Sequence, residues 1–148
     1  MRPSSRLFLT VLLLALACRR ESDPVRATLD RVVKAAQSRD ARAVVENLTG
    51  DYRDAEGQAS PDVAETLRRI FAAYEIVDVR LSDVEIDRAP EAARATFRAD
   101  FSGQPRKLGG LDRFFPSASA YRFEVRLVPE GNRWKVAWAS WEVVGGRS

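Results

Sequence analysis

Acidic and phenolic side chains gather most densely where Asp51, Tyr52, Asp54 and Glu56 stand within six positions. A buried carboxylate can remove a proton as a general base, and a tyrosine hydroxyl can stabilise the oxyanion that forms. These residue types would permit an isomerase-like reaction. They are also the residues of an ordinary solvated loop, so the sequence assigns no catalytic residue.

A second pairing of this kind would join Asp100 with Tyr74 or Tyr121. Asp100 alternates with apolar residues, which favours a place on the solvated side of a strand. Metal chemistry has little support, because the chain has no histidine and Cys18 is its single cysteine. Zinc sites built on these ligands are therefore excluded, and we expect neither a metal nor a cofactor.

The tryptophans form the most distinctive aromatic set. Trp134 and Trp138 share a face of a predicted strand with Val136, which favours core packing. Trp141 falls out of that phase, and large aromatic side chains suit both pockets and interfaces. Trp141 could therefore line the mouth of a pocket or a contact between sheets.

The connection over residues 102–119 is long for two strands, and Phe114 and Phe115 lie within it. On an exposed loop this pair would form a lid or a docking point, whereas beneath the loop it would close the core. The candidate pocket or interface residues are Tyr52, Tyr74, Phe114, Phe115, Tyr121, Trp138 and Trp141.

Three amphipathic helices are predicted in the first half of the chain. Asp23 and Pro24 give the start of the first helix. Asp40 caps a shorter second helix that carries Leu48 and ends at Gly50, and Ser60 begins the third. The polar residues 51–59 between the last two helices are predicted to form a loop.

After Tyr74 the hydrophobic period changes from 3.6 to 2, which predicts strands with one apolar face. Breaks in phase at Ser82–Asp83 and near Ala139–Ser140 predict two β-bulges, which bend strands. We therefore expect an α+β fold in which three N-terminal helices pack on a curved, bulged antiparallel sheet of about four strands. Helices laid across the hollow side of such a sheet would give a cone.

The N-terminus has the features of an export leader. Arg2 and Arg6 make it positive, and residues 7–17 carry no charge. An apolar run of this length is typical of a signal peptide and is too short to span a bilayer as a helix. An ordinary secretory leader, an uncleaved anchor and a cytosolic protein are the alternatives.

Leu14-Ala15-Leu16-Ala17-Cys18 resembles the lipobox of bacterial lipoproteins. The resemblance implies a signal peptide over residues 1–17, cleavage before Cys18, and a lipidated tether over residues 18–22. Diacylation of the Cys18 sulfur would give stable membrane anchoring, because more than one acyl chain is needed for it. We expect a place in the bacterial cell envelope, on the periplasmic face of the outer membrane, since Arg19 rather than aspartate follows the cysteine.

Charge argues against nucleic acid as a partner. The chain has 24 basic and 21 acidic side chains, and the leader would take Arg2 and Arg6 with it. The mature body is then nearly neutral, whereas a nucleic-acid-binding domain needs a strongly basic face.

The segments SRDARAVVENLT and GNRWKVAWASWEV, with the order of helices and strands, resemble the nuclear transport factor 2-like superfamily. The resemblance covers residues 23–144 and leaves residues 145–148 as a tail. It implies an α+β cone with a pocket, which some members use for isomerase, cyclase or dehydratase reactions and others for binding or dimerisation. The His–Asp dyad of the cyclase-like members cannot be present in a chain without histidine.

Two functions follow as hypotheses. The first is a non-enzymatic envelope lipoprotein whose domain binds a small apolar ligand or a protein partner, or forms a homodimer through the outer face of its sheet. The alternative is an enzyme of isomerase or hydratase type that uses Asp and Tyr in the cone pocket.

Overall fold

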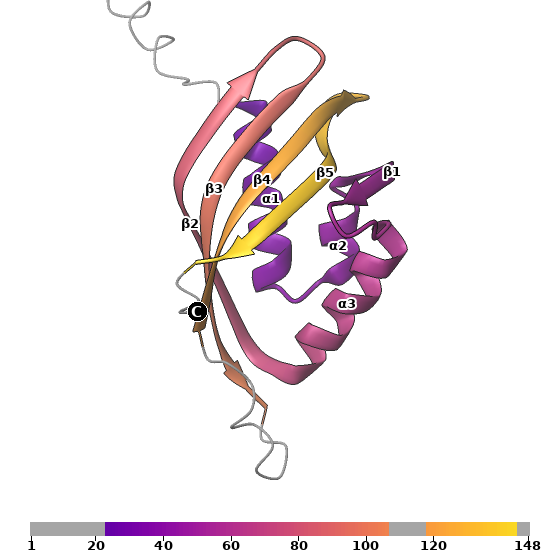
Figure 1. Ribbon diagram of the computed structural model, residues 1–148. Coiled ribbons are helices and arrows are strands. Elements are labelled where there is room, and N and C mark those ends of the chain that lie inside the picture. The colour runs from indigo at the N-terminus through magenta and orange to yellow at the C-terminus, as the bar shows by residue number, and fades with distance from the viewer. Residues whose placement is uncertain (1–22, 107–117, 145–148) are drawn as a thin grey trace, which may run out of the picture.

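The computed structural model describes residues 23–106 and 118–144 (Figure 1). The expectations for Cys18, the leader and tether, Phe114, Phe115 and the tail lie outside these residues. No helix within the described ranges is long and apolar enough to cross a membrane.

Helix α1 (Pro24–Gln37) begins where the sequence predicts it. Asp23 Oδ1 accepts hydrogen bonds from the backbone N–H groups of Val25 and Arg26, at 2.8 and 3.3 Å, so the first turn is capped. Thr28 is fully buried, and its hydroxyl donates to the carbonyl oxygen of Trp134 at 2.7 Å. This bond ties α1 to the last strand of the sheet.

Helix α2 (Ala41–Val45) is shorter than predicted. Asp40 caps it by accepting from the N–H of Ala43 at 2.9 Å, as expected. The chain then leaves the helix and forms strand β1 (Leu48–Asp54). The predictions of a helix up to Gly50 and of a loop from residue 51 are therefore wrong, because parallel pairing with the last strand stabilises an extended backbone here.

At the start of helix α3 (Ser60–Ala73), the Asp62 carboxylate accepts a hydrogen bond from the N–H of Ala59 at 2.9 Å. It packs against α2, β1 and β2. Phe71 is its one buried residue, whereas Ile70 is 44% exposed. The apolar side of this helix is thus only partly covered.

The long strands are β2 (Tyr74–Arg88), β3 (Ala93–Pro105), β4 (Ala118–Glu130) and β5 (Arg133–Val143). They pair antiparallel in the order β5-β4-β3-β2, and β1 joins the β5 edge in parallel. The sheet of the described residues is therefore five-stranded and mixed, not four-stranded and antiparallel. The predicted α+β class with a bulged sheet is confirmed, but the predicted run of three helices is interrupted by β1 between α2 and α3.

The predicted bulge in β2 is confirmed, whereas the bulge in β5 lies at a different position from the predicted one. The β2–β3 register shifts between Ser82 and Glu85, and Asp83 has a positive φ of 52°. In β5 the shift falls at Ala137, because Trp138 pairs with Arg126 and Val136 pairs with Leu127. The second bulge is thus two residues earlier than predicted.

We call the side of the sheet that carries Ala95, Val125 and Val136 the inner face, since these side chains form the buried core. Val25 and Leu29 of α1 join this core, together with small side chains of β3 such as Ala95. In Figure 1 the long strands curve, α1 lies across them, and α3 stands beside the sheet and leads directly into β2.

Candidate functional site

An aromatic cluster occupies one end of the inner face, with Phe123 at its centre. The Phe123 ring centroid lies 5.4 Å from that of Phe97, in a stacked arrangement, and 6.0 Å from that of Trp141. Tyr121 and Phe101 complete the cluster at 6.3 and 6.4 Å from Phe123. Offset and tilted rings at these spacings attract one another beyond simple area burial.

Strand register brings the cluster together. Phe97 pairs with Phe123, and Phe123 pairs with Trp141, so three strands contribute one row of rings. Tyr121 and Phe101 come two positions away along their strands and touch edge to face, with 5.7 Å between centroids. The alternation of side chains in strands keeps all five rings on the inner face.

Burial falls steadily along the inner face of β5. Val136 and Ala139 are 5% and 7% exposed, whereas Trp141 is 38% and Val143 is 62% exposed. The inner face is therefore sealed at one end and open to solvent at the aromatic end. Single exposed apolar residues are common, but contiguous apolar patches and tryptophan side chains are enriched at binding surfaces.

Tyr74 lies beside the cluster, as the first residue of β2. Burial raises the pKa of its phenol, and the nearby Tyr121 phenol is a second cause. The predicted candidates Tyr74, Tyr121 and Trp141 are thus brought to one region. Phe97, Phe101 and Phe123 are not among the candidates predicted from the sequence, although aromatic residues at inward positions of neighbouring strands are a signal for them.

Trp138 lies on the opposite, outer face. The Arg126 guanidinium carbon stands 4.5 Å from the centroid of the Trp138 ring, which is a cation–π contact. The prediction that Trp138 shares a face with Val136 is wrong, because the bulge at Ala137 reverses the alternation before residue 138 and not after it.

The rest of the outer face carries ion pairs. Arg94 binds Glu124 through two hydrogen bonds of 2.9 and 2.8 Å, and Arg98 binds Asp100 at 2.7 Å. Each arginine lowers the pKa of its carboxylate partner. Asp100 therefore does not face Tyr121, and the structure does not support the pairing of Asp100 with a tyrosine.

In the acidic stretch over residues 51–56, some side chains are exposed to solvent and others are buried in the core. Asp51 and Glu56 are exposed, whereas Tyr52 and Asp54 are both 4% exposed and point inward from β1. Burial, with the Asp54 carboxylate as a second cause, raises the pKa of Tyr52 to about 12. The structure thus supplies one buried Asp–Tyr pair.

The two oxygens of Asp54 differ. Oδ1 accepts from the backbone N–H groups of Glu56 and Gln58, both at 2.9 Å, and so fixes the turn after β1. Oδ2 is buried, and no donor in the described residues lies within hydrogen-bonding distance of it. Asp54 pairs with Ala139 in the sheet, and the next inward residue of β5 is Trp141. Asp54 therefore belongs to the same face of the sheet as the aromatic row.

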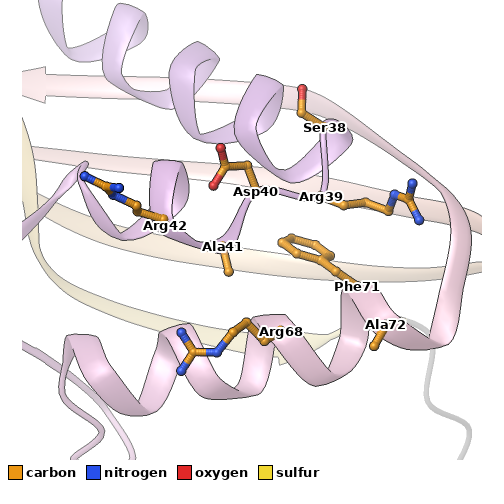
Figure 2. Close-up of a pocket in the computed structure, with 8 residues that line it drawn as sticks. All are labelled: Ser38, Arg39, Asp40, Ala41, Arg42, Arg68, Phe71 and Ala72. Carbon is orange, nitrogen blue, oxygen red and sulfur yellow. The ribbon is translucent and has the colours of Figure 1, made fainter.

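A separate hollow of about 520 Å³ lies between the start of α2 and the end of α3 (Figure 2). Ala41 and Phe71 are buried at its base, and arginines surround it. These cations have partners: Arg42 binds Glu46, Arg68 binds Glu65, and Arg39 donates to the carbonyl oxygen of Tyr74. The arginines around the hollow thus already have ion-pair or hydrogen-bond partners.

No group of three or more acidic, histidine or cysteine side chains in residues 23–106 and 118–144 is arranged to hold a metal ion. Among the described residues, the aromatic cluster best suits an apolar ligand, because its Trp141 end presents accessible apolar surface.

Comparison with solved structures identifies the fold. A candidate scytalone dehydratase from Novosphingobium aromaticivorans superposes with a TM-score of 0.70 at 10% identity, over 82% of either chain. A candidate dehydratase of the NTF2-like family from Streptomyces avermitilis gives 0.68 at 13% identity, over 82% of this chain and 94% of that one. Bd1075 of Bdellovibrio bacteriovorus gives 0.67 at 10% identity, over 81% of this chain and 40% of its own length.

No family model matches the sequence, and no curated protein sequence matches it. The domain has the nuclear transport factor 2-like fold, as the sequence resemblance implies. At these identities the likeness concerns the fold and leaves the chemistry to the residues described above.

Proposed function

We propose that the domain binds a small apolar ligand of aromatic dimensions on the aromatic cluster of its inner face. The observation that carries this proposal is the gradient of exposure along β5, from buried Ala139 to accessible Trp141 and Val143. Covering such surface releases about 25 cal/mol for each Å² of apolar area removed from water. Rings arranged around Phe123 add stacking positions for a planar guest.

The fold supports a small occupant. Two of the solved structures with this architecture are candidate dehydratases, and a dehydratase acts on a small molecule. In this chain the aromatic cluster supplies the apolar surface that small-molecule sites usually have. A protein partner is the competing occupant, and the binding experiment below separates the two.

Membrane attachment through Cys18 is the second part of the proposal. The sequence support is the lipobox-like run that ends at Cys18. Helix α1 begins at Pro24, so six residues can hold the domain at most about 20 Å from the acylated cysteine. The ligand site would then face the envelope space near the membrane surface.

Labelling with a radioactive fatty acid in a bacterial host tests the attachment. We expect label in the wild-type chain and none in Cys18→Ser, with the variant retaining its leader. Equal label in both chains would refute the lipid anchor, and it would leave the ligand proposal untouched.

Equilibrium dialysis with 2-naphthol tests the ligand site. Trp141→Ala should weaken binding about tenfold, since it removes one stacking wall. Trp138→Ala is the matched control, because it removes the same side chain from the outer face three residues away, and it should leave the Kd within about twofold. Equal losses in the two variants, or no binding by the wild-type domain, would overturn the proposal.

The buried Tyr52–Asp54 pair favours one alternative, an isomerase or hydratase type of enzyme. Asp54 would remove a proton beside a carbonyl group, and Tyr52 would donate to the oxyanion. Proton NMR of 2-tetralone in D₂O tests this. Faster deuterium exchange that is lost in both Tyr52→Phe and Asp54→Asn would establish the enzyme, and exchange at the buffer rate would exclude it for this class of ketone.

A further inference from the structure

Two hydroxyl groups are the only polar side-chain groups at the inward positions of β3 and β4. Over residues 93–103 and 119–127 every second side chain lies on the inner face, as the uninterrupted register of the two strands requires. These inward positions carry alanine, phenylalanine, glycine, valine and leucine, with Ser119 and Tyr121 as the exceptions. Both hydroxyl residues therefore lie at the aromatic end of the inner face.

Tyr121 belongs to the aromatic cluster and lies where burial is lowest. Its ring meets that of Phe101 edge to face, with 5.7 Å between centroids, and its centroid lies 6.3 Å from that of Phe123. In the sheet Tyr121 pairs with Ala99 on one side and with Val143 on the other. Val143 is 62% exposed, so the tyrosine borders the open part of this face.

The Tyr121 hydroxyl is available for a new hydrogen bond. It makes none with the part of the chain that the structure describes. In that part, the side-chain oxygens that are both fully buried and without a partner are Thr49 Oγ1 and Asp54 Oδ2, so the Tyr121 hydroxyl is not sealed in the core. Ser119, two residues earlier on the same face, is likewise only partly buried.

The inward positions of β3 and β4 carry no charged side chain. The acidic and basic residues of these strands alternate to the outer face, where Arg94 binds Glu124 through two hydrogen bonds. An ionised ligand among the rings would lose its hydration without gaining an opposite charge from these strands. A neutral ligand would avoid that cost, and an oxygen at its edge could pair with a hydroxyl.

We propose that the Tyr121 hydroxyl donates a hydrogen bond to the bound ligand, and that the ligand class is a neutral ring compound bearing a carbonyl or hydroxyl oxygen at its edge. This inference rests on the proposed function and specifies its ligand. A phenol hydroxyl is both donor and acceptor, so it can pair with either kind of oxygen. A ligand without the oxygen would cover the hydroxyl and leave it unpaired.

Two ligands of similar size test the role of the hydroxyl by equilibrium dialysis. 2-Naphthol carries an oxygen at its edge, and 2-methylnaphthalene has a methyl group in its place. Tyr121→Phe removes the protein hydroxyl and keeps the ring. We expect the affinity for 2-naphthol, divided by that for 2-methylnaphthalene, to fall about two- to tenfold in Tyr121→Phe.

Ser140→Ala is the control, because Ser140 pairs with Glu124 on the outer face. This variant should leave the ratio of affinities as it is in the wild-type domain. A ratio that is the same in wild type and Tyr121→Phe, or that falls equally in Ser140→Ala, would overturn the inference.

The charge of the ligand gives a second test that needs no variant. 2-Naphthoate keeps the two rings and carries an ionised carboxylate at neutral pH. We expect the wild-type domain to bind it about tenfold or more weakly than 2-naphthol, because the carboxylate is desolvated without a cation. Equal or tighter binding of 2-naphthoate would overturn the neutral ligand class.

The outcomes separate this inference from the function on which it rests. If Trp141→Ala weakens both naphthalene ligands and Tyr121→Phe leaves their ratio unchanged, the aromatic site stands and the role of Tyr121 is wrong. If neither ligand binds, or Trp141→Ala changes nothing, the proposed function itself fails.

Discussion

The Arg126 guanidinium carbon lies 4.5 Å from the centroid of the Trp138 ring, on the outer face of the sheet. The two residues are directly paired across β4 and β5. This contact holds Trp138 on the outer face, whereas Trp134 packs against the core and Trp141 belongs to the aromatic end of the inner face. Trp138 and Trp141 are three residues apart on opposite faces of the sheet, so each serves as the control for the other in the binding experiment.

A double-mutant cycle should detect the contact between Arg126 and Trp138. We expect Arg126→Ala and Trp138→Ala to show a coupling energy of about 0.5–1 kcal/mol, the range of exposed cation–π pairs. Urea unfolding of the two single variants and the double variant gives this number. Additive effects of the two substitutions would place Trp138 away from Arg126.

The exposure gradient of the inner face predicts unequal costs of truncation. Leu127 is fully buried, so Leu127→Ala should lower the free energy of unfolding by about 2–5 kcal/mol. Val143 is mostly exposed, and Val143→Ala should change it by less than about 0.5 kcal/mol. Denaturant unfolding at one pH compares the two variants directly. A large loss in Val143→Ala would mean that the aromatic end is closed.

Two glycines in strands should respond differently to alanine. A methyl group on Gly103 would stand 2.7 Å from the carbonyl oxygen of Ile76 and 3.0 Å from the Tyr74 ring, whereas nothing lies within 4 Å of one on Gly50. Gly103→Ala should therefore cost about 1–3 kcal/mol. Gly50→Ala should be neutral or stabilising by about 0.4–1 kcal/mol, through the unfolded chain. Thermal unfolding of both variants checks this ranking, and a stable Gly103→Ala would argue against the close approach of β2 and β3.

We expect the free energy of unfolding to fall in alkali, because the Tyr52 phenol loses its proton there. Burial and Asp54 raise the pKa of Tyr52 from 10.0 to about 12, so the folded domain holds this proton more tightly than the unfolded chain does. The contribution to stability is complete below pH 10 and is lost as the pH rises toward 12.

Tyr52→Phe removes the titrating group and should flatten the fall of Tm over that interval. Circular dichroism melts at several pH values measure the effect. Parallel curves for wild type and Tyr52→Phe would show that Tyr52 titrates as an ordinary surface tyrosine.

Local patterns in the sequence were enough to predict much of this fold. Strict alternation from Ala93 to Phe101 predicts a strand with one buried face, and β3 has it. In β2, the break in alternation at Ser82–Asp83 corresponds to a bulge. Asp23 and Asp40 are capping residues whose hydrogen bonds form as their positions imply. These features depend on residues close together in the chain, and so the sequence contains them directly.

Strand β1 was missed because nothing local favours it. Its residues include Gly50, Asp51 and Asp54, which are poor strand formers, and its pairing partner β5 begins some eighty residues later. The predicted face of Trp138 is wrong for a related reason. A shift in phase shows that a bulge exists, but several neighbouring positions satisfy the same pattern, and pairing with Arg126 decides among them.

The site could be predicted only in part. Single aromatic residues were recognisable as candidates, yet the cluster around Phe123 exists because three strands align in one register. Asp54 was visible as one acid among several. Its burial, and the difference between its two oxygens, follow from the turn at Glu56–Gln58 and from pairing with Ala139.

A crystal structure of the domain soaked with 6-bromo-2-naphthol tests the central claim most directly. The anomalous signal of bromine marks the ligand independently of any assumption about its pose. We predict a bromine peak on the inner face, with the rings in contact with Trp141 and Phe123. A peak on the outer face beside Trp138, or in the hollow between α2 and α3, with no peak at the aromatic cluster, would contradict the account.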